Sequence, residues 1–256
     1  MPKATFRFYA ELNDFLPEDK RHRTFSVSFS GHETVKHLLE TVGVPHTEVD
    51  LILINGKSVG FHQKVQDGDR VSVYPMFEIL DISKLTEVRP DPLREPTFVV
   101  DNHLGKLAGY LRLLGFDTLY ENDFQDPELA FISSHENRIL LTRDRGLLKR
   151  KQVTHGYCVR SDDPKDQIVE VLRKFDIANY VQPYTRCARC NGLLKPVEKE
   201  EVLAHLEPLT KKHYDAFMQC QDCQQVYWKG SHFQELHEFL TRVVEKSKVE
   251  EKTDED

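Results

Sequence analysis

Residues 97–115 read TFVVDNHLGKLAGYLRLLG, and their pattern indicates the fold class of the chain. The run TFVV predicts a short buried strand, which ends at Asp101. Apolar side chains then recur on one face of a helix that Gly115 ends, namely Leu104, Leu107, Ala108, Leu111 and Leu114. A strand, an acid and an amphipathic helix in direct succession predict the first unit of an α/β sheet.

The same alternation continues toward the C-terminus. The segments FDTLY, RILLTRD and GYCVR predict further strands, and DPELAFISSHEN and DPKDQIVEVLRKF predict helices with a proline at the first position. Strands that alternate with helices form a parallel sheet covered by helices on both faces. In such a sheet the working residues lie just past the carboxyl ends of the strands.

Two further modules flank this α/β region. Residues 1–80 show two strand-like runs, a helix over Thr34–Val42 and further strands, an order that resembles the β-grasp fold of ubiquitin and sulfur carriers. Three prolines predict a linker over residues 81–96. We then expect the α/β domain at 97–183, a zinc ribbon with a C-terminal helix at 184–246, and a disordered acidic tail at 247–256.

Composition restricts the classes of function. The chain has 256 residues and a formal net charge of −7, so bulk charge does not attract it to nucleic acid and binding needs local basic patches. No apolar stretch reaches the length of a membrane span, and the N-terminus lacks a secretory apolar region. Four of the five cysteines stand in two C-x-x-C pairs, which favours a metal site in a reducing, cytoplasmic setting.

Acids follow the predicted strands. Asp101 and Asp144 end apolar strands with no evident capping role, and Asp162 follows the strand that ends near Arg160. Asp126 and Asp163 each precede a proline at a first helical position, so an N-cap explains them as well as a functional role does. Carboxylates gathered at one edge repel each other unless Mg²⁺ or Mn²⁺ binds them, and such a site suits phosphodiester hydrolysis.

Basic residues near these acids are candidate contacts to RNA phosphates, although surface arginines often do nothing specific. They are Lys106, Arg112, Arg143 and Arg145.

The cysteine pairs predict a structural zinc site. Cys187, Cys190, Cys220 and Cys223 supply two knuckles that complete a tetrahedral set of four thiolates, which leaves no open position for catalysis. The insertion between the pairs predicts a helix around Glu200–His205. In VYWKGSH, after the second pair, Lys229 and His232 are candidate contacts to single-stranded RNA, while Trp228 is expected to pack in the ribbon core.

Five motifs of this chain resemble, in their order, the PIN-like RNase family with an appended zinc ribbon, which is named after the C-terminal domain of the Mut-seven exoribonuclease. The motifs are VVDNHLGKLAGYLRLLGFDT, ILLTRDRGLL, VRSDD, CARCN and CQDCQQVYWKGSHF. The resemblance covers about 97–233, and members also carry an N-terminal ubiquitin-like domain. It implies hydrolysis of RNA by metal-binding acids at Asp101, Asp144 and Asp162 or Asp163, with Asp126 as our choice for the second acid. Thr142 would be the hydroxyl residue near the third-strand acid.

Two other classes of function remain open. One is a non-catalytic RNA-binding or ribosome-associated protein, in which the ribbon supplies affinity. The other is a sulfur carrier or conjugation factor, which needs a free C-terminal diglycine, whereas the β-grasp module runs from YPMFEILD into the linker. We therefore expect the β-grasp to be a docking or regulatory module for a protein partner, whose removal leaves a folded nuclease.

Overall fold

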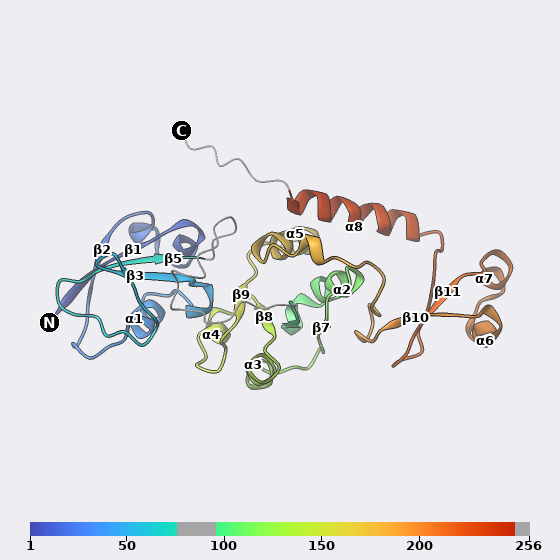
Figure 1. The fold of residues 1–256 in the computed structure, drawn as a ribbon, viewed down its shortest axis with the longest axis horizontal. Coiled ribbons are helices and arrows are strands. Elements are labelled where there is room, and N and C mark those ends of the chain that lie inside the picture. The colour runs from blue at the N-terminus through green and yellow to red at the C-terminus, as the bar shows by residue number, and fades with distance from the viewer. Residues whose placement is uncertain (76–95, 249–256) are drawn as a thin grey trace. The chain divides into compact units, whose positions relative to one another are not determined.

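The computed structural model describes residues 1–75 and 96–248. The chain forms two compact units, drawn with their elements in Figure 1. Unit 1 comprises Met1–Glu95 and Asp126–Cys158, and unit 2 comprises Pro96–Gln125 and Val159–Asp256. The expected linker at 81–96 lies outside the described residues, apart from Pro96. In the described ranges, none of the helices combines the length and apolar content that crossing a membrane would require.

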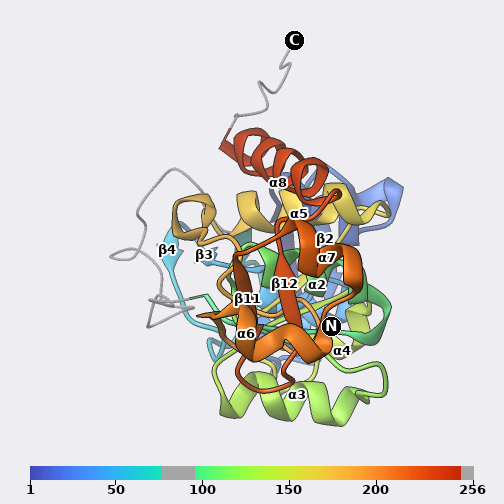
Figure 2. The same ribbon diagram turned by 90° about the vertical axis from the view of Figure 1, so that its right-hand side faces the viewer.

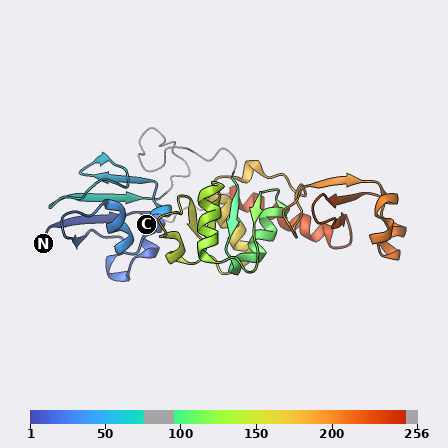
Figure 3. The same ribbon diagram turned by 90° about the horizontal axis from the view of Figure 1, so that it is seen from below.

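The N-terminal part of unit 1 is a β-grasp, as expected. Its sheet has the order β2-β1-β5-β3-β4, in which β1 pairs with β5 in parallel and the other pairs are antiparallel. Helix α1 lies against one face of this sheet (Figure 3) and buries Val35, Leu38 and Leu39. The elements are β1 (Lys3–Phe8), β2 (Phe25–Ser28), α1 (Val35–Thr41), β3 (Leu51–Ile54), β4 (Lys57–Ser58) and β5 (Arg70–Tyr74), with short 3-10 turns η1 (Ala10–Phe15), η2 (Glu18–Lys20) and η3 (His46–Glu48).

The alternation of buried and exposed residues in β1 and the N-cap of α1 explain why these elements form in this module. Ala4, Phe6 and Phe8 of β1 are fully buried while the residues between them are partly exposed, which is the period-two pattern of a strand with one covered face. The Thr34 side chain accepts a hydrogen bond from the His37 backbone N–H at 3.3 Å and so caps α1. The sequence therefore predicted the order of strands and helix in this module, and the helix lies within the expected range Thr34–Val42.

Unit 1 also contains α3 (Asp126–His135), β8 (Ile139–Thr142), α4 (Arg145–Leu148) and β9 (Gly156–Cys158). Strands β8 and β9 pair in parallel, and all their residues are buried. A strand buried on both faces is typical of a parallel sheet covered by helices. Cys158, at the end of β9, is buried as the sequence predicted.

Unit 2 contains residues 97–115, which form β6 (Phe98–Val100), the 3-10 turn η4 (Asn102–Leu104) and α2 (Gly105–Leu113). All five residues of the predicted apolar stripe are buried. Gly115, at φ +95°, ends the helix, and a Cβ there would collide with the Gln182 carbonyl oxygen. Strand β7 (Thr118–Leu119) pairs with β6 in parallel, so unit 2 contributes a parallel pair as unit 1 does with β8 and β9.

Helix α5 (Pro164–Lys174) packs against the C-terminal helix α8 (Phe233–Lys248), which lies along it in Figures 1 and 2. The Arg173 guanidinium donates to the Lys246 carbonyl at 2.8 Å, and the Lys165 ammonium lies 5.7 Å from the Phe239 ring centroid. Because α8 continues to Lys248, the expectation of a disordered tail from residue 247 is wrong for residues 247–248. The remaining tail, 249–256, lies outside the described residues.

The ribbon is a three-stranded antiparallel sheet of β10 (Leu194–Val197), β11 (Phe217–Cys220) and β12 (Val226–Trp228). The predicted insertion helix is α6 (Lys199–Val202) followed by η6 (Leu203–His205), and α7 (Pro208–His213) was not predicted. The small core consists of Val202, Leu206, Phe217 and Val226. Trp228 is 38% exposed and meets Phe217 only at a ring-centroid distance of 6.5 Å, so the expectation of a core tryptophan is wrong.

Candidate functional site

Four cysteine sulfurs gather at the base of the ribbon. The ligand atoms of Cys187, Cys190, Cys220 and Cys223 all lie within 4.8 Å of one another, and across the described ranges they are the one group of three or more such residues close enough to hold an ion. The chain folds alike in both knuckles, because the residue after the second cysteine of each pair, Asn191 or Gln224, has a positive φ. Four converging thiols form a donor set that fits a metal ion such as zinc.

Burial and hydrogen bonds shift the pKa values of the cysteine thiols. Burial by itself raises the pKa of Cys187, but the Tyr227 hydroxyl and backbone N–H groups of the knuckle lower it to about 7. The Tyr227 oxygen lies 3.1 Å from the Cys187 sulfur. Burial raises the pKa of Cys190 to about 12, so the thiols do not all ionise readily without an ion. Metal binding therefore has to displace protons, and it weakens as the pH falls.

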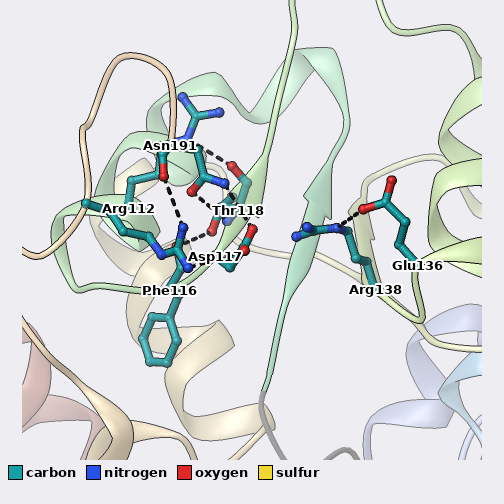
Figure 4. Close-up of polar contacts among 8 residues, drawn as sticks. Arg112, Phe116, Asp117, Thr118, Glu136, Arg138 and Asn191 are labelled. Atoms are coloured by element: carbon teal, nitrogen blue, oxygen red, sulfur yellow. Dashed lines mark hydrogen bonds and ion pairs between the residues drawn. The ribbon is translucent and has the colours of Figure 1, made fainter. Parts of the chain in front are cut away.

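Arg112 fastens the first knuckle to the α/β domain, as Figure 4 shows. Its side chain leaves α2 and is only 4% exposed. The guanidinium donates to the Thr118 carbonyl at 2.9 Å and the Tyr120 carbonyl at 3.3 Å, both around β7. It also donates to the Arg189 carbonyl at 2.8 Å and the Ala188 carbonyl at 3.3 Å, inside the knuckle. Burial lowers the pKa of Arg112, an effect that nearby Glu121 and the cysteine thiols oppose.

A second set of polar contacts also connects the first knuckle to the residues around β7. The Asn191 side-chain oxygen accepts from the Thr118 backbone N–H, and its side-chain nitrogen donates to the Asp117 carboxylate, each at 2.9 Å (Figure 4). Arg186 pairs with the same carboxylate at 3.3 Å. Because buried polar groups are costly unless they are hydrogen-bonded, this network holds the knuckle in one position. Arg112 therefore has a structural role, and the expectation that it contacts RNA phosphates is wrong because its guanidinium is buried and its donors are bound to carbonyl oxygens.

Three of the candidate acids lie in unit 2. Asp101 directly follows β6 and is 7% exposed, at the N-cap position of η4 but with no side-chain capping bond. Asp163 caps α5, since its Oδ1 accepts from the Lys165 backbone N–H at 2.7 Å, so the capping interpretation is confirmed for this residue. Asp162 beside it is exposed.

The other two candidate acids lie in unit 1. Asp144 caps α4, because its Oδ1 accepts from the Gly146 backbone N–H at 2.7 Å, so the expectation that it has no capping role is wrong. The Thr142 hydroxyl accepts from the Asp144 backbone N–H at 2.9 Å and fixes the turn. Asp126 is the first residue of α3, and its Oδ2 lies 3.2 Å from Nη2 of Arg150.

The remaining basic candidates are exposed, namely Lys106, Arg143, Arg145, Lys229 and His232. Lys229 lies beside aromatic rings that the sequence analysis missed. Its ammonium is 5.4 Å from the Phe233 ring centroid, and Phe233 stacks with His237 at 5.7 Å and 9°. The Tyr184 ring lies 5.1 Å from Phe233. Helical spacing of Phe233 and His237 was the available signal, whereas Tyr184 joins them only through the fold.

Two family models match this chain, one over each of its two large regions. The Mut7-C RNAse domain model matches residues 96–240, more than half of the chain, and the Mut7-C ubiquitin model matches residues 1–81. The chain belongs to the Mut7-C RNAse domain family, which confirms the resemblance found in its motifs. Membership supports a nuclease-type function in general.

Comparison with individual proteins finds similarity over less than a third of the chain. No curated protein matches the chain. The crystal structure of small archaeal modifier protein 1 from H. volcanii is similar at 17% identity with a TM-score of 0.25, covering 30% of this chain and 100% of that one. A second crystal structure of SAMP1 from Haloferax volcanii is similar at 18% identity with a TM-score of 0.24, covering 29% of this chain and 96% of that one.

We predict that the purified protein carries one zinc ion and that replacing Cys187 and Cys190 together with serine releases it. Two of four ligands are then lost, and a site whose binding energy contributes to folding unfolds locally. Elemental analysis measures the zinc, and hydrogen exchange over residues 184–230 measures the unfolding. Replacing the remaining cysteine, Cys158, with serine is the control and leaves the zinc content unchanged. Full zinc retention by the double variant contradicts the assignment.

We predict that Arg112→Ala lowers the free energy of unfolding by about 3 kcal/mol, because buried carbonyl oxygens lose their donors. Chemical denaturation of the full chain measures the change. Arg189→Ala is the matched control, since Arg189 is an exposed arginine of the same knuckle. If both variants are equally stable, Arg112 does not fasten the knuckle.

Proposed function

We propose that this protein hydrolyses RNA phosphodiester bonds at an acidic site that binds Mg²⁺ or Mn²⁺. The observation that carries the proposal is Asp101, a carboxylate kept at 7% exposure at the carboxyl end of buried strand β6, in a member of an RNase family. A buried carboxylate is expensive to maintain, so its retention at the working edge of a parallel sheet favours a role in function.

Asp144 is the proposed second ligand, just past the carboxyl end of buried strand β8. Its capping bond does not oppose this role, because one carboxylate oxygen serves the Gly146 N–H and a carboxylate has two oxygens. The cap instead fixes the orientation of the group. Asp126, Asp162 and Asp163 are the further candidates, and carboxylate oxygens are the ligands that Mg²⁺ and Mn²⁺ prefer.

A bound divalent ion supplies an activated water and stabilises the leaving oxygen. The chain's own residues hold the ion and orient the RNA. Lys106, Arg143 and Arg145 are exposed and are proposed to hold phosphate oxygens near the acids. The ribbon is proposed to add affinity for single-stranded RNA, with Lys229 and His232 on phosphates and the rings of Tyr184, Phe233 and His237 stacking on bases.

The proposed setting is the cytoplasm, where cysteines stay reduced and available to a metal. A protein partner of the β-grasp module is part of the same proposal, in keeping with the ubiquitin-like family of that module.

We predict that Asp101→Asn and Asp144→Asn each reduce cleavage by about two orders of magnitude or more. Asparagine keeps the shape of the side chain but removes the charge that binds the ion. It is also a good N-cap, so Asp144→Asn leaves α4 folded. The measurement is cleavage of a labelled single-stranded RNA in Mg²⁺ or Mn²⁺. Asp123→Asn, at an exposed acid outside the proposed site, is the control and cleaves like wild type.

Equal cleavage by wild type and both variants would place the activity elsewhere or in a contaminant. RNA binding by wild type without any cleavage would favour the non-catalytic alternative.

We predict that the variant Asp163→Asn distinguishes two roles of Asp163, metal ligand and N-cap of α5. Because asparagine caps a helix nearly as well as aspartate, stability stays within about 0.5 kcal/mol of wild type. Thermal unfolding checks the stability, and the RNA assay checks the activity. A loss of cleavage at unchanged stability assigns Asp163 to the metal site, and unchanged cleavage leaves it as the cap of α5 alone.

A further inference from the structure

The β-grasp module and residues 145–158 belong to one compact unit, and buried polar contacts join them. The turn η3 lies against β9. Its residue Glu48 is 2% exposed, and its Oε1 accepts from the Cys158 backbone N–H at 2.5 Å. A buried charge-assisted hydrogen bond of this kind is strong, and separating its partners leaves a carboxylate to be resolvated or neutralised.

His46, two residues before Glu48, makes a second buried contact. It is 4% exposed, and its Nε2 lies 2.8 Å from the Val153 carbonyl oxygen, in the segment between α4 and β9. Its Nδ1 lies 2.8 Å from Oε1 of Glu40, at the end of α1. The imidazole is therefore held by its own module on one side and reaches across to the segment after α4 on the other.

Helix α4 itself is fastened at both ends. At its first residue, Arg145 places its guanidinium 4.8 Å from the Phe15 ring centroid and donates to the Asp14 carbonyl at 3.3 Å. Just past its last residue, the Lys149 ammonium donates to the Glu40 carbonyl at 3.1 Å. A four-residue helix has little stability of its own, so tertiary contacts decide its position.

We propose that the β-grasp is a positioning module for Asp144. Asp144 caps α4 and immediately precedes Arg145, so the contacts that fix α4 also fix the carboxylate. Glu48 and His46 are positioning residues, which act through the backbone of 145–158 and do not touch RNA. This inference rests on the proposed role of Asp144 in binding metal. It replaces the expectation that removing the β-grasp leaves a folded nuclease, because α4 and β9 would lose these partners.

The test uses full-length protein with Glu48→Ala, Glu48→Gln and His46→Ala. The control is His62→Ala, at an exposed histidine of the same module. Hydrogen exchange over residues 144–158 reports the position of α4 and β9. The Mn²⁺ concentration for half-maximal RNA cleavage reports the metal site, and KM for RNA reports binding of the substrate.

We expect Glu48→Ala and His46→Ala to raise exchange over 144–158 by about tenfold, the effect of losing one buried hydrogen bond. We expect the Mn²⁺ concentration for half-maximal cleavage to rise in the same variants while KM for RNA stays unchanged. General destabilisation of the protein does not change one of these quantities without the other. Glu48→Gln keeps an acceptor oxygen and restores most of the protection and activity. His62→Ala matches wild type. If Glu48→Ala does not fold, Lys149→Met takes its place, because it removes one donor and keeps the side-chain length.

Unchanged exchange over 144–158 in Glu48→Ala and His46→Ala overturns the proposal, whatever the cleavage shows. Raised exchange with an unaltered Mn²⁺ requirement and turnover also overturns it. If wild type cuts no RNA, the proposed nuclease function fails separately. Mn²⁺ affinity, measured by electron paramagnetic resonance, then replaces the cleavage assay, and equal affinity in wild type and Glu48→Ala overturns the positioning role.

Discussion

The buried guanidinium of Arg112 joins the α/β domain to the first cysteine knuckle. A cation removed from water is tolerated only if its donors are satisfied, and here backbone carbonyls around β7 and in the first cysteine knuckle satisfy them. One side chain therefore links helix α2, strand β7 and the cysteine site. The first cysteine knuckle is therefore attached to the α/β domain by hydrogen bonds from a buried side chain.

Capping and metal binding are compatible uses of one carboxylate. Asp144 and Asp163 each give one oxygen to the backbone at a helix start, which restricts the side chain to one orientation. A ligand that is already oriented loses less entropy when an ion binds. Asp101 has no capping bond and is buried instead, so the proposed site combines carboxylates restrained by different physical means.

The β-grasp module makes buried polar contacts with the segment that contains α4 and β9. Its turn η3 presents Glu48 and His46 to β9 and to the segment before it, both as buried polar contacts. Such contacts add specificity, because any other placement leaves a buried charge or ring nitrogen without its partner. The family model that matches the first 81 residues describes the fold of this module, and these contacts support its proposed positioning role.

The strands, the longer helices, the cysteine knuckles and the family could be predicted from the sequence, because strand alternation, helix stripes and C-x-x-C spacing are local patterns, whereas the short helices α4 and α7 were not predicted. Leu107 and Leu111 lie in the core where their spacing put them. The burial of Arg112, the capping bond of Asp144 and the contact of Glu48 with β9 became evident from the folded chain alone. The reason is physical: these roles depend on hydrogen bonds to backbone groups whose positions the fold alone sets, and side-chain type does not reveal them.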